Sequence, residues 1–145
     1  MELILNSIDF AENRPSDGFS SGGELYFAVG EGFFPSEHWY DSAWLDLKTW
    51  LPRLISFGSN HTDSCELPFM DGPYTLRLIR QKDGTIHTDF LFNTAVVRSL
   101  QDLNVRLLLK SALSCCRKYD RFLYENGKSN RFQEEIKTLT KLLDT

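Results

Sequence analysis

The side chains best suited to nucleophilic, redox or metal chemistry in this sequence are three cysteines and three histidines. Cys115 and Cys116 are adjacent in a segment with helical periodicity, where successive side chains diverge by about 100°, and Cys65 stands alone. This odd number of thiols does not indicate a disulfide framework. Zinc sites use closely spaced pairs of ligands, whereas the histidines are isolated, at His38, His61 and His87. We therefore predict no metal or cofactor, and expect one thiol of the adjacent pair in the core and the other at its edge.

Nucleophilic catalysis needs a thiol or hydroxyl beside a base, and the order of residues does not supply such a pair. The chain contains neither the phosphate-binding G-x-x-x-x-G-K-[ST] nor the zinc-binding H-E-x-x-H. His87 lies in an expected strand with no neighbouring nucleophile, which favours a structural role. We predict a binding protein rather than an enzyme. The alternative is a small enzyme with a dispersed site in which Cys65 meets His61 or His87.

Charge is distributed unevenly along the chain. Residues 1–72 carry 3 Lys and Arg against 12 Asp and Glu, a balance of −9, whereas residues 73–145 carry 13 against 8, a balance of +5, which together give the net charge of −4. Such an imbalance bears on partners rather than on fold. A phosphate backbone requires Lys and Arg, so nucleic acid is not the expected partner. The acidic half favours a surface for a basic protein, with a merely solubilising role as the alternative.

Aromatic residues concentrate in the same acidic half. We expect Trp44 and Trp50 in the core, and Trp39 and Tyr40 as possible anchors for a partner, because Trp and Tyr are enriched at interface hot spots. The acidic residues that we predict to contact this partner are Glu31, Glu37, Asp41, Asp46, Asp63, Glu66 and Asp71.

Strands are indicated in the first two thirds of the chain. The segments Leu3 to Phe10 and Leu25 to Val29 are rich in residues that favour strands, and the polar, glycine-rich stretch Ala11 to Gly23 predicts a loop. Two further strand-like runs between Tyr74 and Phe92 flank Asp83-Gly84, a pair preferred in tight hairpin turns. We therefore predict an antiparallel hairpin in this segment.

Helical spacing marks the other segments. Apolar residues recur at helical spacing from Leu47 to Ile55, in a run that contains Pro52. A long helix is expected from Ser99, with Asp102 completing its cap, to a stop at Asn126-Gly127.

A final helix is expected to follow, with Ser129 or Asn130 as its cap. Strands precede helices in this order of elements, which is typical of the α+β class. We predict a single domain over residues 1–145, in which an antiparallel sheet with a central hairpin is covered on one face by the C-terminal helices.

Two stretches, together with the hairpin, resemble small bacterial immunity proteins. They are the run EHWYDSAWLDL from Glu37 to Leu47 and the run LPFMDGPY from Leu67 to Tyr74. The resemblance extends over most of the chain in length and element order, and it is to the group that protects cells against toxins of contact-dependent growth inhibition systems. It implies a non-enzymatic inhibitor that binds the toxin domain of its own system, often a nuclease with a basic substrate groove. The acidic half agrees with this, because negative charge can imitate nucleic acid and speed association.

An adaptor or scaffold that uses an exposed sheet edge is a further alternative. The chain has no apolar run near the roughly 20 residues that span a bilayer, and its first residues lack the pattern of a signal peptide. We therefore expect a cytoplasmic protein without a membrane partner.

Overall fold

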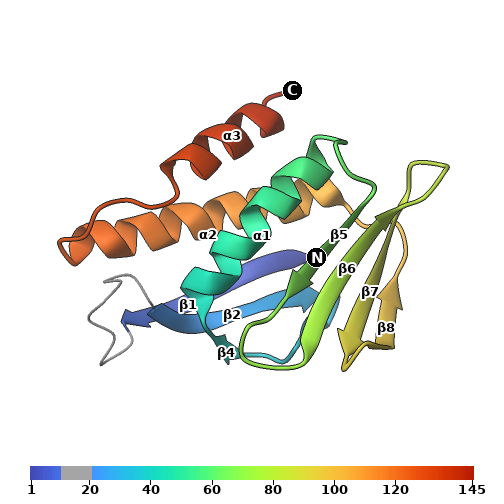
Figure 1. The fold of residues 1–145 in the computed structure, drawn as a ribbon, viewed down its shortest axis with the longest axis horizontal. Coiled ribbons are helices and arrows are strands. Elements are labelled where there is room, and N and C mark those ends of the chain that lie inside the picture. Colours follow the sequence, from blue (N-terminus) through green and yellow to red (C-terminus); the bar gives the residue numbers. More distant parts are fainter. Residues whose placement is uncertain (11–20) are drawn as a thin grey trace.

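The computed structural model describes residues 1–10 and 21–145, which form two antiparallel sheets and three helices (Figure 1). The expected loop from Ala11 to Gly23 lies outside the described residues as far as residue 20, and its last three residues belong to a strand. In chain order the elements are β1 (Glu2–Phe10), β2 (Ser21–Val29), β3 (Gly32–Phe34), β4 (Tyr40–Asp41), α1 (Ala43–Gly58), β5 (Ser64–Pro68), β6 (Tyr74–Arg80), β7 (Ile86–Phe92), β8 (Ala95–Leu100), α2 (Val105–Glu125) and α3 (Gln133–Leu143).

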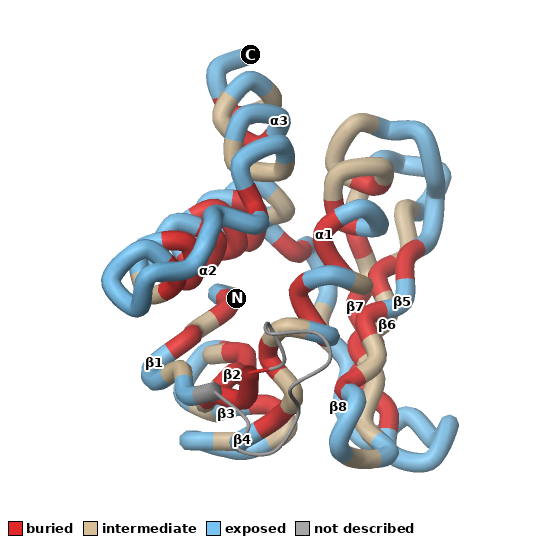
Figure 2. Tube along the Cα trace, turned by 60° about the vertical axis from the view of Figure 1, so that its left-hand side comes forward, coloured by how far each residue is buried: buried red, intermediate tan, exposed pale blue. Residues whose placement is uncertain are grey.

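The two sheets have different topologies. In sheet 1, β2 pairs with β1, β3 and β4, whereas sheet 2 runs in the simple order β5-β6-β7-β8. Helix α1 packs against β2 and β5 and so links the sheets, while α2 packs against β1 (Figure 2). The α+β class is confirmed. The predicted antiparallel sheet is divided into two sheets, and α1 packs against them in addition to the predicted C-terminal helices.

An aromatic cluster forms the core between the sheets. Trp50 of α1 stacks on Phe27 of β2 with 5.6 Å between ring centroids, and it meets Phe69 edge-on at 4.8 Å. Phe34 of sheet 1 meets Phe90 of sheet 2 at 5.0 Å. All five rings are buried. Because these rings come from both sheets and from α1, the sheets share one core.

A second cluster joins the three helices. Trp44 of α1 packs on Phe132, with 5.3 Å between ring centroids, and lies 6.1 Å from the ring of Tyr119 in α2. The prediction that only one of the adjacent thiols is in the core was wrong, since Cys115 and Cys116 are both buried. Helix α2 contacts β1, α1 and α3, so residues on more than one side of it are covered.

The predicted hairpin is confirmed over β6 and β7, which pair in continuous register. The turn is a three-residue loop, Lys82-Asp83-Gly84, closed by the backbone N–H of Gln81, which donates to the carbonyl of Thr85 at 2.8 Å. Gly84 has a φ of +87°, a conformation that side chains other than glycine adopt at a cost.

The predicted start of the long helix was wrong, although its end was right. Ser99 belongs to β8, because the β-branched segment before it pairs with β7, and Asp102 has a φ of +55°. Helix α2 begins at Val105, where the Asn104 side chain accepts a first-turn N–H at 3.1 Å. It ends before Asn126-Gly127, and Gly127 has a φ of +71°.

The N-terminus of α3 is not capped by the residues that were predicted to cap it. Neither Ser129 nor Asn130 is its N-cap residue. Instead the carboxylate of Asp120, in α2, accepts the backbone N–H groups of Arg131 and Phe132 at 3.0 and 3.1 Å. This contact ties the entry of α3 to the helix on which it packs.

Replacing Gly84 by Val should lower the free energy of unfolding by about 1–2 kcal/mol, because valine must adopt a left-handed backbone conformation. No atom lies within 4 Å of the position that a Cβ would take at Gly84, so the cost comes from the backbone rather than from a clash. Urea denaturation checks this value. The matched control is Gly84→Asn, which tolerates this conformation better and should lose less. Equal losses for the two variants would contradict the explanation.

Candidate functional site

A polar surface surrounds Tyr40 at the place where β4 pairs with β2. Strand pairing places Glu24 opposite Tyr40, and the phenol O–H donates to the carboxylate of Asp9, in β1, at 3.1 Å. Asp71, whose charge also acts on Tyr40, is held by the hydroxyl of Ser42, which donates to it at 2.9 Å. We call this region the Tyr40 surface and define it as Asp9, Glu24, Glu37, His38, Tyr40 and Asp71.

The Tyr40 surface combines an exposed ring with carboxylates. Tyr40 is 52% exposed, and a Cβ at Gly22 would collide with its phenol, so glycine allows the ring to lie against the backbone of β2. Partial burial, the hydrogen bond to Asp9 and the charges of Asp9 and Asp71 raise the pKa of Tyr40. The imidazole of His38 lies between two acidic side chains, 3.1 Å from Glu24 and 3.6 Å from Glu37.

A buried carboxylate supports this surface from below. Asp41 is fully buried and accepts hydrogen bonds from the indole N–H of Trp39 at 2.7 Å and from the backbone N–H groups of Ser42 and Met70 at 2.9 and 3.1 Å. Several donors converging on one carboxylate are what an ionised group needs when it leaves water. Asp41 thereby joins β4, the start of α1 and the loop after β5.

A second buried carboxyl group, that of Asp46, lies beside the first. Its Oδ1 accepts the N–H of Met70 at 2.9 Å, while its Oδ2 receives no hydrogen bond from an N–H or O–H group of the described residues. Burial, followed by the hydrogen bond and the charge of Asp41, raises the pKa of Asp46 to about 10. Two buried carboxyl groups in contact cannot both ionise without large repulsion, so Asp46 keeps a proton at neutral pH and donates it to Asp41.

The predicted contact residues therefore divide into three groups. Glu37, Tyr40 and Asp71 come together in the Tyr40 surface. Asp41 and Asp46 were wrongly predicted to contact a partner, because both are fully buried and are used to hold neighbouring segments.

The remaining predicted residues lie elsewhere or are partly covered. Glu31 is in the β2–β3 turn, Asp63 lies 3.7 Å from Arg80, and Glu66 is an exposed residue of β5. Trp39 is half-buried and packs on Tyr74 with 5.2 Å between ring centroids. Trp39 thus supports the surface and contributes little exposed area.

Sequence reasoning missed Asp9, Glu24 and His38. Asp9 and Glu24 lie on neighbouring strands that meet only through sheet pairing. The one available signal was that Glu24, Glu37 and His38 flank strand-like segments on the acidic side of the chain.

The alternative site around Cys65 is not assembled in the described residues. Cys65 pairs with Leu78 and, through it, with Thr88, so these residues share a face of sheet 2. His87 precedes Thr88 and points to the opposite face. His61 is exposed, whereas Cys65 is buried, and burial raises the pKa of its thiol to about 11.

His87 instead belongs to a polar network on the open face of sheet 2. Its Nε2 lies 2.7 Å from the carboxylate of Asp89, which also accepts hydrogen bonds from Ser99 at 2.8 Å and Arg77 at 3.0 Å. Although burial opposes the effect, the hydrogen bonds from Ser99, Arg77 and His87 lower the pKa of Asp89. Ser99 donates to Asp89 and not to His87, so this arrangement does not activate the hydroxyl as a nucleophile.

One further serine, Ser20, lies in a sequence that matches a known nucleophile motif. Residues 18–22 read GFSSG, which fits the G-x-S-x-G pattern. That pattern acts as a nucleophile elbow when a strand precedes it and a helix follows directly. Here β2 begins at Ser21, so a strand follows in place of the helix.

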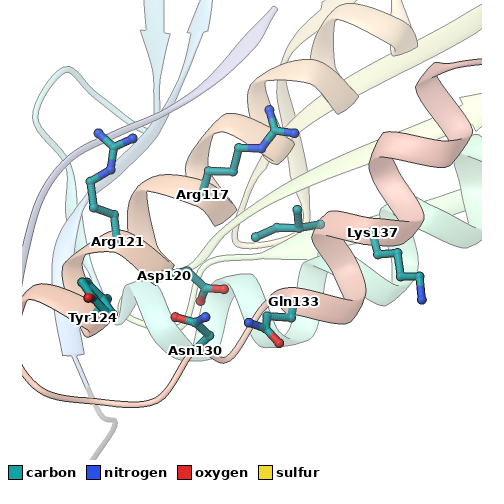
Figure 3. Close-up of a pocket in the computed structure, with 8 residues that line it drawn as sticks. Arg117, Asp120, Arg121, Tyr124, Asn130, Gln133 and Lys137 are labelled. Carbon is teal, nitrogen blue, oxygen red and sulfur yellow. The ribbon is translucent and has the colours of Figure 1, made fainter.

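A groove of about 660 Å³ lies between α2 and α3 (Figure 3). Arg117 and Arg121 project from α2 away from the centre of the groove, whereas Asp120 lies at that centre. Both oxygens of Asp120 accept backbone N–H groups at the entry of α3. The one carboxylate among the described residues that line this groove is therefore already occupied.

Replacing Asp46 by Asn should stabilise the protein at neutral and alkaline pH. The folded chain holds the Asp46 proton up to about pH 10, whereas the unfolded chain releases it near pH 4, so the free energy of unfolding should fall as pH rises between these values. Asparagine keeps a donor for Asp41 and an acceptor for Met70 without titrating. Urea denaturation of Asp46→Asn at pH 8 should show a gain of about 1 kcal/mol or more.

Asp46→Ala is the control for this prediction, because it removes the titration and the hydrogen bonds together and should destabilise the fold. If the free energy of unfolding depended on pH in the same way for the wild type and Asp46→Asn, Asp46 would be ionised in the folded chain.

Among the described residues, no group of three or more His, Cys, Asp or Glu side chains is arranged to hold a metal ion. Within the same part of the chain, no helix is long and apolar enough to cross a membrane. Comparison of the sequence with family models and curated proteins, and of the fold with solved structures, returns no match.

Proposed function

We propose that this protein is an immunity protein that binds and neutralises a basic bacterial toxin domain, such as a nuclease, through the Tyr40 surface. The observation that carries the proposal is an exposed tyrosine that donates to Asp9 and lies near further carboxylates. Asp71 is close enough to raise its pKa, Glu24 lies opposite it in the strand pairing, and Glu37 is linked to Glu24 through His38. The resemblance of the segment around Tyr40 to immunity proteins of contact-dependent growth inhibition systems agrees with this role.

Rigid support makes Tyr40 suitable as an anchor. Tyrosine contributes a large contact area while losing few rotatable bonds, and hot-spot residues are enriched in Tyr, Trp and Arg. The bond to Asp9 and the contact with Gly22 restrict the ring before any partner binds. Beneath it, Asp41 holds β4 and the loop that carries Asp71 in one arrangement. A preformed surface avoids part of the entropic cost of binding.

The charge of this surface suits a basic partner. Four carboxylates within one small region attract cations over roughly the Debye length of 8 to 10 Å at physiological salt. A nuclease domain binds phosphates with Lys and Arg, so an acidic inhibitor can occupy the same groove. Inhibition then requires only that the inhibitor cover the groove, and no catalytic group is needed on the inhibitor.

Replacing Tyr40 by Ala should weaken binding to the toxin domain encoded beside this gene by about 2 kcal/mol, or roughly thirtyfold in Kd, because it removes the central anchor. Calorimetry with the purified domain and rescue of cells that express it measure the effect. A wild-type chain that neither binds nor rescues contradicts the proposed function. Wild-type binding that Tyr40→Ala leaves unchanged would place the interface elsewhere.

Raising salt from about 50 to 500 mM should slow association tenfold or more and change dissociation less, because exposed charges act mainly on encounter. Glu37→Lys should also slow association and reduce the dependence on salt. Its matched control is Glu66→Lys, which makes the same charge change at an exposed position of β5, away from the Tyr40 surface. Replacing Asp41 by Lys is not a suitable test, because Asp41 is fully buried and the substitution would place a cation inside the fold. Equal slowing by both reversals would show that only net charge matters.

A further inference from the structure

An apolar region lies beside the Tyr40 surface. Figure 1 shows that β4, the loop between β5 and β6, and the turn between β7 and β8 lie at the same end of the molecule. Met70, in that loop, and Phe92, the last residue of β7, are each 40% exposed. We call this region the apolar strip and define it as Trp39, Met70, Tyr74 and Phe92.

Ring contacts join the apolar strip to the Tyr40 surface. Trp39, the neighbour of Tyr40 in the chain, packs on Tyr74 with 5.2 Å between ring centroids. Tyr74 in turn packs on Phe92, also with 5.2 Å between ring centroids. The strip therefore extends from β4 of sheet 1 to the end of β7 in sheet 2. Exposed apolar surface that is bordered by polar residues is typical of an interaction site.

The apolar strip is held in one arrangement before any partner binds. The backbone N–H of Asn93 donates to the carbonyl of Pro73 at 2.9 Å, which ties the turn after β7 to the loop that carries Met70. Asn93 and Thr94 both have positive φ, +49° and +69°, as tight hairpin turns require. The N–H of Met70 donates to the buried carboxylate of Asp41 at 3.1 Å. A preformed surface loses less entropy when it binds.

The charge around the apolar strip selects the kind of partner. Residues 72–76 and 90–97 contain no charged side chain, whereas the adjoining Tyr40 surface carries carboxylates. A basic partner is therefore attracted at the Tyr40 surface and meets no repulsion at the strip. A second copy of this chain, packed symmetrically through the same strip, would bring its own carboxylates against these. Like charges that meet in this way disfavour binding, so an acidic partner does not fit.

Interface size also favours a contact that includes the apolar strip. Specific interfaces bury about 800 Å² on each partner and involve roughly 20–30 residues from each. They place an apolar centre inside a polar rim. The Tyr40 surface is small and mostly charged, so it supplies the polar part alone. The strip supplies the apolar part directly beside it.

We propose that the contact surface for the toxin domain extends from the Tyr40 surface over the apolar strip, and that the toxin presents basic residues beside an apolar side chain that packs on Phe92 and Met70. This inference rests on the proposed function and names the chemistry of its partner. The carboxylates speed encounter, whereas burial of the strip slows dissociation, because apolar contacts form only after the surfaces meet.

The test is surface plasmon resonance of Phe92→Ala with the purified toxin domain encoded beside this gene. Phe92→Ala should raise the dissociation rate about tenfold or more while leaving the association rate and its dependence on salt unchanged. The matched control is Leu107→Ala, because Leu107 is 36% exposed and lies in α2, outside the strip. It should change neither rate. Met70→Ala provides a second truncation within the strip and should also speed dissociation.

Hydrogen exchange of the wild-type chain gives a readout that needs no substitution, because residues 92–95 should exchange more slowly in the complex than in the free protein. Circular dichroism confirms that each variant is folded. A wild-type chain that does not bind the toxin domain overturns both the proposed function and this inference. Binding that Tyr40→Ala weakens, but that Phe92→Ala and Met70→Ala leave unchanged, preserves the proposed function and overturns the role of the strip. Equal losses in Phe92→Ala and Leu107→Ala overturn it as well, because the effect would not be local.

Discussion

The arrangement around Tyr40 depends on a buried pair of carboxyl groups, those of Asp41 and Asp46. Asp41 collects donors from β4, from the start of α1 and from the loop after β5, and Asp46 approaches it from α1. Burying two carboxyl groups is costly unless one stays protonated and the other is well hydrogen-bonded. Both conditions are met here. The pair therefore defines how β4 lies against α1, and with it the position of the exposed side chains above.

That pair also explains why the two sheets meet where they do. Helix α1 begins beside Asp41 and carries Trp50 into the aromatic cluster that contains Phe27 and Phe90. The same helix then covers the β5 edge through Trp50 and Arg53. One helix thus joins the sheets, supports the Tyr40 surface and covers the β5 edge of sheet 2.

Charge segregation along the chain has a structural counterpart. The acidic first half supplies the Tyr40 surface, while the basic second half supplies α2, whose Lys118 and Arg106 donate to backbone carbonyls of β1 and of Leu143. Part of the basic charge is therefore used inside the fold. The exposed acidic charge is not neutralised in this way at Glu37, whose described ionic partner is His38.

The sequence by itself determined the features that depend on neighbouring residues. Asp83-Gly84 specifies its turn because only a few residues accept the backbone angles there, and Asn126-Gly127 ends α2 for the same reason. The order of strands and helices was sufficient for the α+β class. The helical spacing was misleading only at its start, because Ser99 and Leu100 belong to β8, which pairs with β7.

Tertiary structure alone decided which acidic residues face a partner. Asp41 and Glu37 have the same charge and similar neighbours in the sequence, yet one is buried and the other exposed. Burial of a carboxyl group depends on donors brought from Trp39, Met70 and Asp46, and no local pattern encodes their convergence. The order of strands in the two sheets was equally hidden, because neighbouring residues do not encode which strands pair.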